Sequence, residues 1–179
     1  LLCQVRGEAA QVRDEACTAF ALTGKATKGG KTLAGQNQDL APEYGDFAIL
    51  LRIDPSDERP RMLMFTFAGQ LGYSGLNEHG IAHFANALYD CPWQMGLPHY
   101  PIKRVCLEQT NLSGIDRVLS DHPTCSAGNL VICTGKGEVA DYEIRPEGPA
   151  RYYGDDEDSI IHANHYLTCL LYTSPSPRD

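Results

Sequence analysis

The stretch ACTAFAL at residues 16–22, continued by LAGQNQD at residues 33–39, decides the fold of this chain. Two short apolar runs flank a connection rich in lysine and glycine, and the pair Gly29-Gly30 can supply the positive φ angles of a tight reversal. The pattern predicts a β-hairpin whose first strand begins at Cys17. We expect this hairpin to present the Cys17 sulfur opposite the carboxylate of Asp39.

A cysteine that opens a strand, beside a strand that ends in Asn-x-Asp, is the arrangement of an N-terminal nucleophile enzyme. In such an enzyme the peptide bond before the nucleophile is cut, which releases a free α-amine. A thiol has an ordinary pKa of about 8.5 and an α-amine one of about 7.7–8.0, so a single residue would carry the nucleophile and its proton acceptor. Before the cut, the Cys17 thiol would attack the carbonyl of Ala16 in an N-to-S acyl shift, leaving a thioester that water cleaves.

Four stretches resemble, in family order, the motifs of the isopenicillin N acyltransferase family, formally acyl-coenzyme A:6-aminopenicillanic acid acyltransferase. They are EACTAF at residues 15–20, GQNQD at 35–39, GIAHFANAL at 80–88 and IHANHYL at 161–167. The same Cys-Thr, Asn-x-Asp and Asn pattern is similar, more distantly, to bile salt hydrolases and penicillin V acylases. The resemblance implies the αββα sandwich of the N-terminal nucleophile hydrolases, here incomplete at both ends.

The resemblance also implies a role for each of four polar residues. Cys17 would be the nucleophile, released by autocleavage between Ala16 and Cys17. Asp39 would hold the Cys17 amine or a neighbouring donor, Asn86 would donate its NH₂ group to the tetrahedral oxyanion, and Asn164 would orient substrate or nucleophile. The family usually has glycine in place of Ala16, and a Cβ there limits the strained backbone that favours self-cleavage. No metal ion and no organic cofactor is implied.

Each candidate also has a structural interpretation. A free cysteine is commonly a small core residue, an aspartate can close a turn, and an asparagine can end a strand with hydrogen bonds. Alternation along the second strand of the hairpin sends Gln36 and Gln38 away from the face of Asp39, whereas Asn37 shares that face.

Apolar runs beyond the hairpin predict further strands. Residues 47–53 are almost entirely apolar, as expected for a strand covered on both faces, and residues 61–68 predict a second buried strand. Apolar spacing predicts helices around residues 102–106 and 115–119, the latter after a capping-box-like Ser113-x-x-Asp116. Strands, then helices, then strands again indicate α+β layers. The other predicted strands are residues 81–88, 129–133, 139–144 and 159–167.

The composition is that of one globular domain, with 179 residues of which 42% are hydrophobic and 21% charged. A formal charge of −8 disfavours nucleic acid and anionic membrane as partners, because both repel an acidic chain. Small molecules are the expected ligands, and no apolar run approaches the roughly 20 residues of a membrane span. Seven cysteines, an odd number without regular spacing, indicate reduced thiols and favour a cytoplasmic location.

Three segments are distinguished along the chain. Residues 1–16 are interpreted as the end of a pro-segment, and residues 17–170 as the N-terminal nucleophile hydrolase domain. Residues 171–179 change abruptly to serine and proline and resemble the adaptor-derived tails of metagenomic reading frames. On that interpretation the natural chain continues past Leu170, and the arginine that helps the family's active site has no counterpart here. We therefore expect the isolated fragment to be inactive or poorly folded.

Two other functions are compatible with the sequence. A papain-like hydrolase would pair Cys17 with His162 or His165 as the base. A non-catalytic α+β binding domain would use the loop of residues 90–101, in which Trp93 would form a pocket wall or lid. Because His162 and His165 lie three apart on a predicted strand and face opposite ways, a shared metal ion is not expected.

The favoured function is that of a self-processing cysteine amidohydrolase or acyltransferase. Cys17 would attack the carbonyl carbon of an amide or thioester, and water or an amine would then accept the acyl group from the acyl-enzyme. Hydrolysis is preferred over transfer, because transfer requires a site that holds the amine and excludes water. The substrate is expected to be a small acyl amide or acyl thioester.

Overall fold

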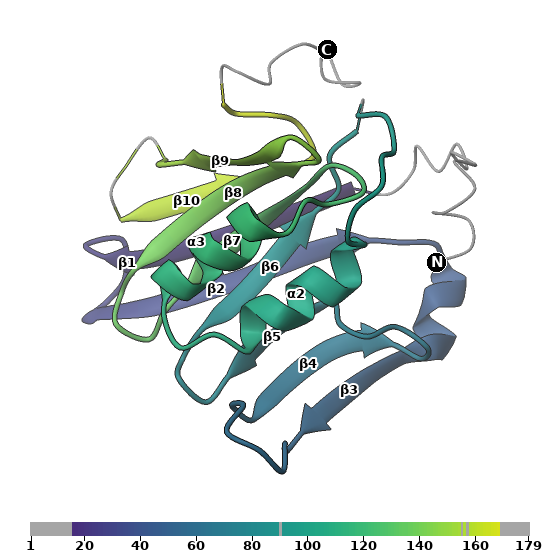
Figure 1. Ribbon diagram of the computed structural model, residues 1–179. Coiled ribbons are helices and arrows are strands. Elements are labelled where there is room, and N and C mark those ends of the chain that lie inside the picture. The colour runs from purple at the N-terminus through teal and green to yellow at the C-terminus, as the bar shows by residue number, and fades with distance from the viewer. Residues whose placement is uncertain (1–15, 90, 155, 157, 169–179) are drawn as a thin grey trace.

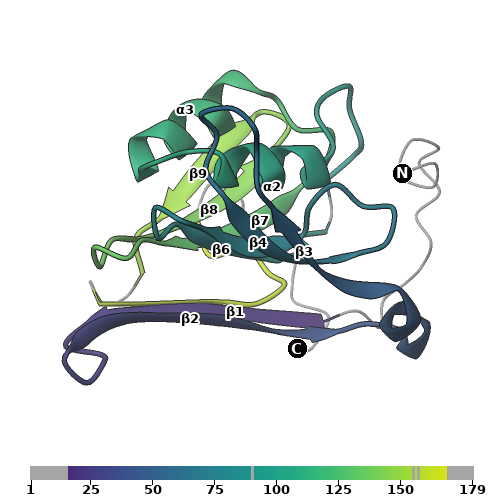
Figure 2. The same ribbon diagram turned by 90° about the horizontal axis from the view of Figure 1, so that it is seen from below.

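The computed structural model describes residues 16–89, 91–154, 156 and 158–168. Residues 1–15 of the predicted pro-segment and the Ser/Pro-rich residues 171–179 lie outside them. The described chain forms three layers, which Figure 2 shows from the edge: a three-stranded sheet, a seven-stranded sheet and a pair of helices. The predicted α+β layering is therefore confirmed.

The opening hairpin consists of β1 (Ala16–Gly24) and β2 (Gly30–Asp39), paired antiparallel. Gly29 and Gly30 have φ angles of 77° and 69°, the left-handed values that the predicted reversal requires. A third strand, β10 (Ser159–His162), pairs with the free side of β1, so the sheet order is β10-β1-β2. The predicted hairpin is confirmed, and a segment more than 130 residues further along the chain completes its sheet.

The seven-stranded sheet is an antiparallel meander, because its strands lie side by side in chain order. Consecutive antiparallel strands need only short connections, and both helices are inserted in the connection between the fourth and fifth strands of this sheet (Figure 1). A short 3-10 helix, η1 (Pro42–Phe47), leads from the hairpin into it. The strands are β3 (Ala48–Ile53), β4 (Met62–Phe67), β5 (Ser74–Asn77), β6 (Ala82–Asn86), β7 (Gly128–Cys133), β8 (Val139–Arg145) and β9 (Gly148–Tyr152).

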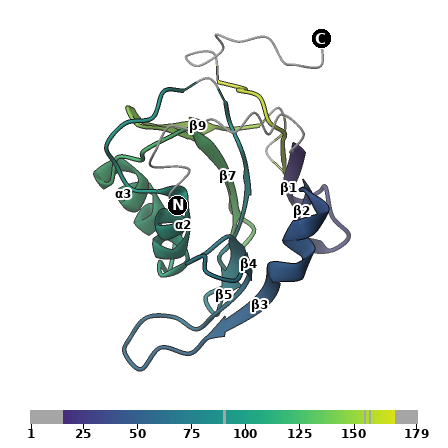
Figure 3. The same ribbon diagram turned by 90° about the vertical axis from the view of Figure 1, so that its right-hand side faces the viewer.

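Two helices, α2 (His99–Leu107) and α3 (Leu112–Asp121), cover one face of the seven-stranded sheet, and the hairpin lies on the other (Figure 3). Their apolar faces bury the main core against the sheet, as the helical spacing predicted. Neither helix in the described part of the chain has the length and apolarity needed to cross a membrane. The largest fully buried side chains of this core are Met64, Ile81, Ile102, Leu107, Ile115, Leu119, Leu130, Ile132 and Ile144.

The start of α3 differs from the prediction. The N-cap is Asn111, whose side-chain oxygen accepts a hydrogen bond of 2.9 Å from a main-chain N–H of the first turn. The predicted capping box at Ser113 is wrong, because the helix begins one residue before it. Asp116 instead accepts a hydrogen bond from the hydroxyl of Tyr142 on β8.

A second, smaller core lies between the two sheets. It contains Ala19 and Ala21 from β1, Val131 and Cys133 from β7, and Ile160 from β10, all buried. Small side chains on β1 let the sheets approach closely. This packing fixes which side of β1 faces β7, and Cys17 lies on that same side.

The predicted coverage of the apolar strand 47–53 is wrong. This segment forms β3 at the edge of the sheet, and Leu50 is 74% exposed. On β4, Leu63 and Phe65 are also exposed, whereas the alternate residues are buried under the helices. The three-stranded sheet packs over β6, β7 and β8, so the same face of β3, β4 and β5 stays open.

Candidate active site

Cys17 lies on the inner face of β1 and is 8% exposed. Its main-chain N–H donates a hydrogen bond of 2.6 Å to Oδ1 of Asn164, which follows β10. The side-chain NH₂ of Asn164 donates in turn to the carbonyl oxygen of Ala87, just after β6, at 2.8 Å. The side chain of Asn164 thus links the main chain of Ala87 to the main chain of Cys17, the predicted nucleophile.

The structure does not place the Asp39 carboxylate opposite the Cys17 sulfur. The register pairs Cys17 with Gln38 and pairs Asp39 with Ala16. Directly opposed residues share a face and neighbours alternate, so Asp39 lies on the outer, exposed face. The predicted opposition is wrong because register sets the face of every side chain, and an irregularity between Leu22 and the turn shifts this register.

The same register confirms that Gln36 and Gln38 face away from Asp39, and it puts them on the face of Cys17. The side chain of Gln36 reaches the seven-stranded sheet. Its Oε1 accepts from Oγ of Ser74 at 3.0 Å and from the main-chain N of Ala85 at 3.2 Å, and its Nε2 donates to the Ala85 carbonyl at 2.5 Å. No pattern in the sequence indicates this contact, which joins the two sheets on the face of β2 that lies next to Cys17.

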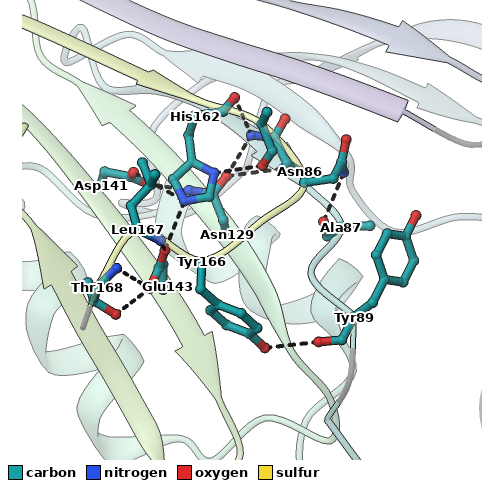
Figure 4. A network of polar contacts seen from close by, with 12 residues as sticks. Asn86, Ala87, Tyr89, Asn129, Asp141, Glu143, His162, Tyr166, Leu167 and Thr168 are labelled. Carbon is teal, nitrogen blue, oxygen red and sulfur yellow. Dashed lines mark hydrogen bonds and ion pairs between the residues drawn. The ribbon is translucent and has the colours of Figure 1, made fainter. Parts of the chain in front are cut away.

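Asn86 is buried at the end of β6, as Figure 4 shows. Its NH₂ group donates to Oδ1 of Asn129 at 3.0 Å and to the carbonyl oxygen of His162 at 2.8 Å. Both amide protons are therefore committed, and the predicted oxyanion role finds no free N–H in this geometry. These contacts fit the interpretation of Asn86 as a hydrogen bonder at a strand end, and its oxyanion role stays a prediction.

A buried ionic cluster lies next to Asn86 and involves His162 of β10 with Asp141 and Glu143 of β8 (Figure 4). Nε2 of His162 lies 3.1 Å from Oε1 of Glu143 and 3.7 Å from Oδ2 of Asp141, and all three side chains are fully buried. Nδ1 of His162 lies 2.7 Å from the carbonyl oxygen of Ala163. Both ring nitrogens of His162 therefore face acceptor oxygens, an arrangement that favours the doubly protonated ring.

Burial, hydrogen bonds and charge set the protonation of this cluster. Burial favours a lower pKa for His162, but the hydrogen bond to Glu143 and the charge of Asp141 outweigh it and raise the pKa. Burial favours a higher pKa for Glu143, but its hydrogen bonds from His162 and Thr168 lower it. Burial, with the charge of Glu143 added, raises the pKa of Asp141 to about 7 against the attraction of His162. Both directions favour the charged forms of His162 and Glu143.

The alternative papain-like dyad of Cys17 with His162 or His165 gains no support from the contacts of His162. Both ring nitrogens of His162 are engaged by Glu143 and Ala163. The predicted strand of residues 159–167 ends at His162, so the alternation expected for His165 does not apply. The ring of His165 instead stacks on that of His162, with centroids 6.3 Å apart.

Glu143 also holds the segment that follows β10. Its carboxylate accepts hydrogen bonds from the main-chain N of Leu167, from the main-chain N of Thr168 at 3.2 Å and from the Thr168 hydroxyl. One carboxylate therefore binds His162 at the start of this segment and Leu167 and Thr168 at its end. Asn164, which contacts the Cys17 main chain, lies between these two attachments.

Cys17 lines neither of two hollows on the surface of the described residues. One, of about 380 Å³, lies over β3, β4 and β5, where Arg61 pairs with Glu78 at 2.8 Å. The other, of about 530 Å³, lies between the loop before α2 and the end of α3. Trp93 is 41% exposed and lines neither hollow, so its predicted role as a pocket wall gains no support here.

The sequence matches the family model described as acyl-coenzyme A:6-aminopenicillanic acid acyl-transferase over residues 26–174. It is 29% identical over 148 residues to the acyl-coenzyme A:6-aminopenicillanic-acid-acyltransferase 40 kDa form of Emericella nidulans. These residues make up 82% of this chain and 40% of the relative, so the chain spans less than half of that protein's length.

Two solved structures share the fold. The Caenorhabditis elegans ortholog of N-acylethanolamine-hydrolyzing acid amidase superposes with a TM-score of 0.65 at 14% identity, over 84% of this chain and 70% of that one. A mutant conjugated bile acid hydrolase from Clostridium perfringens superposes with a TM-score of 0.63 at 16% identity, over 86% of this chain and 54% of that one. The fold is therefore the predicted αββα sandwich, of which the described residues form one helical layer and both sheets. The resemblance in the motifs is confirmed as well: the chain belongs to the acyl-coenzyme A:6-aminopenicillanic acid acyltransferase family.

Proposed function

We propose that this chain carries the nucleophile of a self-processing cysteine enzyme that cleaves or transfers the acyl group of an amide or thioester. The observation that carries the proposal is the 2.6 Å hydrogen bond from the main-chain N of Cys17 to Asn164. Its partner is a side chain 147 residues away, on a segment held at both of its ends. A hydrogen bond from so distant a residue supports a catalytic role for this nitrogen, since catalytic groups must be held in one geometry.

The first proposed step is self-cleavage. The sulfur of Cys17 attacks the carbonyl carbon of Ala16, the C–N bond breaks, and the proton of the thiol passes to the nitrogen of residue 17. Water then hydrolyses the thioester, which releases a chain ending at Ala16 and a second chain beginning at Cys17. The hydrogen bond to Asn164 fixes the direction of the nitrogen that becomes the α-amine.

The second step uses that amine as the base. One N–H stays on Oδ1 of Asn164, so the lone pair is directed elsewhere and can accept the proton of the Cys17 thiol. The sulfur adds to the substrate carbonyl, the ammonium returns its proton to the leaving amine or thiol, and an acyl-enzyme remains. Attack by water completes hydrolysis, and attack by an amine completes transfer.

Asp39 and Asn86 have supporting roles in this proposal. Asp39 is paired with Ala16, the residue that cleavage removes. Loss of this last pair frees the end of β2, and only then would the Asp39 carboxylate approach the new ammonium of Cys17. Asn86 holds the carbonyl of His162 at 2.8 Å and thereby steadies the segment that carries Asn164.

The substrate class follows from the family and from the chemistry of a thiol nucleophile. The relative from Emericella nidulans is named for transfer from acyl-coenzyme A to 6-aminopenicillanic acid. An acyl thioester or acyl amide is the corresponding proposal for this chain. Hydrolysis remains the preferred outcome, because transfer requires a site that holds the acceptor amine and excludes water. A cytoplasmic location remains a prediction.

Intact-mass measurement and N-terminal sequencing of the expressed full-length precursor test the proposal. We expect a new N-terminus at Cys17, no cleavage in Cys17→Ala, and unchanged cleavage in Cys91→Ala, which alters a half-buried thiol outside the site. Ala16→Gly should accelerate the cut, because glycine relieves the restriction on the strained backbone. An active preparation whose sequence reads through residues 15, 16 and 17 would overturn the proposal.

A further inference from the structure

Lys103 is a buried lysine that the proposed function does not use. It lies on α2 and is 8% exposed, whereas lysines are almost never fully buried without a partner. Its ammonium lies 4.6 Å from the ring centroid of Tyr73 and 5.5 Å from that of Tyr100. Two aromatic faces at such distances stabilise a cation.

The groups around Lys103 leave its charge almost without anions. His83 and His99 are both buried, and burial together with the positive charge of Lys103 lowers their pKa values to about 3 and about 4. Both histidines are therefore neutral near pH 7. Arg104, the next residue of α2, pairs with Glu108 at 3.6 Å and with Leu71 O at 3.4 Å, so Glu108 is already paired.

Cys17 is the group that favours the charged form of Lys103. Burial lowers the pKa of Lys103 to about 8, and among the described residues only the charge of Cys17 opposes this by raising it. A buried ammonium without a counter-charge is strongly unfavourable. The negative charge available to this one is a thiolate at the head of β1.

An opening in the seven-stranded sheet explains how a helix residue can act on the hairpin. β5 and β6 pair only at Gly75–His83 and Leu76–Ala82. Beyond these pairs, the side chain of Gln36 fills the space between the strands by bonding Ser74 and Ala85. Tyr73, whose ring holds the Lys103 ammonium, directly precedes Ser74. Lys103 and Gln36 thus contact the neighbouring residues Tyr73 and Ser74, the first from α2 and the second from the hairpin.

We propose that Lys103 is a positioning residue for the nucleophile, whose ammonium acts through the opening between β5 and β6 to hold the Cys17 sulfur as a thiolate. The proposal rests on Cys17 being the nucleophile, as proposed above. The proton of the thiol goes to the solvent or to the α-amine, and Lys103 keeps its own proton throughout. The ion pair raises the fraction of reactive sulfur at neutral pH, because the thiolate is the attacking form.

The test is the pH dependence of Cys17 alkylation by iodoacetamide, measured on the Cys17 peptide by mass spectrometry. Lys103→Met removes the charge and keeps the length of the side chain. We expect its alkylation midpoint to move up by about one pH unit, which is a roughly tenfold slower reaction at pH 7. Lys103→Arg should stay near the wild type, and Lys136→Met, which changes an exposed lysine in the β7–β8 turn, should match it.

Wild type and variants are compared in the same processing state, established by intact mass. A Lys103→Met profile that superimposes on the wild type, with an unchanged circular dichroism spectrum, overturns the proposal. If Lys103→Met does not fold, or if Cys17 resists alkylation, the reverse measurement decides. Competitive acetylation of Lys103 should then show a lower midpoint in Cys17→Ala than in the uncut wild-type chain, and an equal midpoint overturns the pairing.

The two proposals fail in different ways. A chain that never cuts between residues 16 and 17 contradicts self-processing, yet it can still show coupled titration of Lys103 and Cys17. A chain that cuts normally while Lys103→Met has no effect on alkylation contradicts only the role of the lysine.

Discussion

Replacing Glu143 by glutamine tests whether one buried carboxylate holds the segment that carries Asn164. The carboxylate accepts four hydrogen bonds, from Nε2 of His162, from the main-chain N of Leu167, and from the main-chain N and hydroxyl of Thr168. An amide of the same shape offers one oxygen in place of two, so one or two of these donors lose their acceptor. A buried donor without an acceptor costs about 1–3 kcal/mol, so Glu143→Gln should lower the free energy of unfolding by roughly 2–4 kcal/mol.

The assay for Glu143→Gln is urea denaturation followed by far-ultraviolet circular dichroism, at pH 7 and constant temperature. Glu147→Gln is the matched control, because Glu147 is an exposed carboxylate at the end of the same hairpin arm and should change stability by less than about 0.5 kcal/mol. Amide hydrogen exchange at Leu167 and Thr168 should accelerate in Glu143→Gln alone. Equal unfolding curves for the two variants, with unchanged exchange at both amides, would refute the reasoning.

Three further predictions test the structure elsewhere. Gln36→Ala removes three hydrogen bonds between the sheets and leaves a main-chain donor and a main-chain acceptor of β6 without partners. The free energy of unfolding should therefore fall by about 2–4 kcal/mol, against about 0.5 kcal/mol or less for the outward-facing control Asn37→Ala. Gly75→Ala puts a Cβ 2.5 Å from a β4 carbonyl oxygen and should lower the thermal midpoint, whereas Gly45→Ala meets open space and should not. Burial raises the pKa of Asp141 to about 7, so the folded state keeps a proton that the unfolded state releases near pH 4. The wild type should therefore lose stability relative to Asp141→Asn as the pH rises from about 4 to 7, by an amount on the order of 4 kcal/mol, measured by denaturation at each pH.

Secondary-structure elements that depend on nearby residues were predictable from the sequence. The opening hairpin follows from two apolar runs and a glycine pair, and β1 and β2 occupy nearly the predicted residues. The helices follow from apolar residues at helical spacing. Both patterns report local backbone preference and one buried face, and these are fixed within a dozen residues.

Features that depend on distant packing were not predictable. The apolar sequence of β3 reports a preference for strand, but whether a layer covers it depends on where the hairpin docks, and Leu50 stays exposed. The face of Asp39 depends on an irregularity near the hairpin turn. Lys103 and Glu143 lie in no motif, and Gln36 lies in one that assigns it no contact, because the partners of these residues lie 19 to 49 residues away or on another layer.

The two buried basic side chains, His162 and Lys103, differ in the groups that surround them. His162 has two carboxylates, Glu143 and Asp141, within 3.7 Å, and this pairing is complete without any substrate. Lys103 has aromatic rings and neutral histidines around it, and the charge that favours its protonation is that of Cys17. A structural ion pair loses nothing when chemistry proceeds, whereas the proposed Lys103–Cys17 pair would lose its negative member each time the sulfur is acylated. The acyl-enzyme would then leave a buried cation uncompensated, and hydrolysis would restore the pair. Lys103 would therefore favour deacylation and raise the fraction of reactive thiolate, while loss of the pair would oppose the acylation step itself.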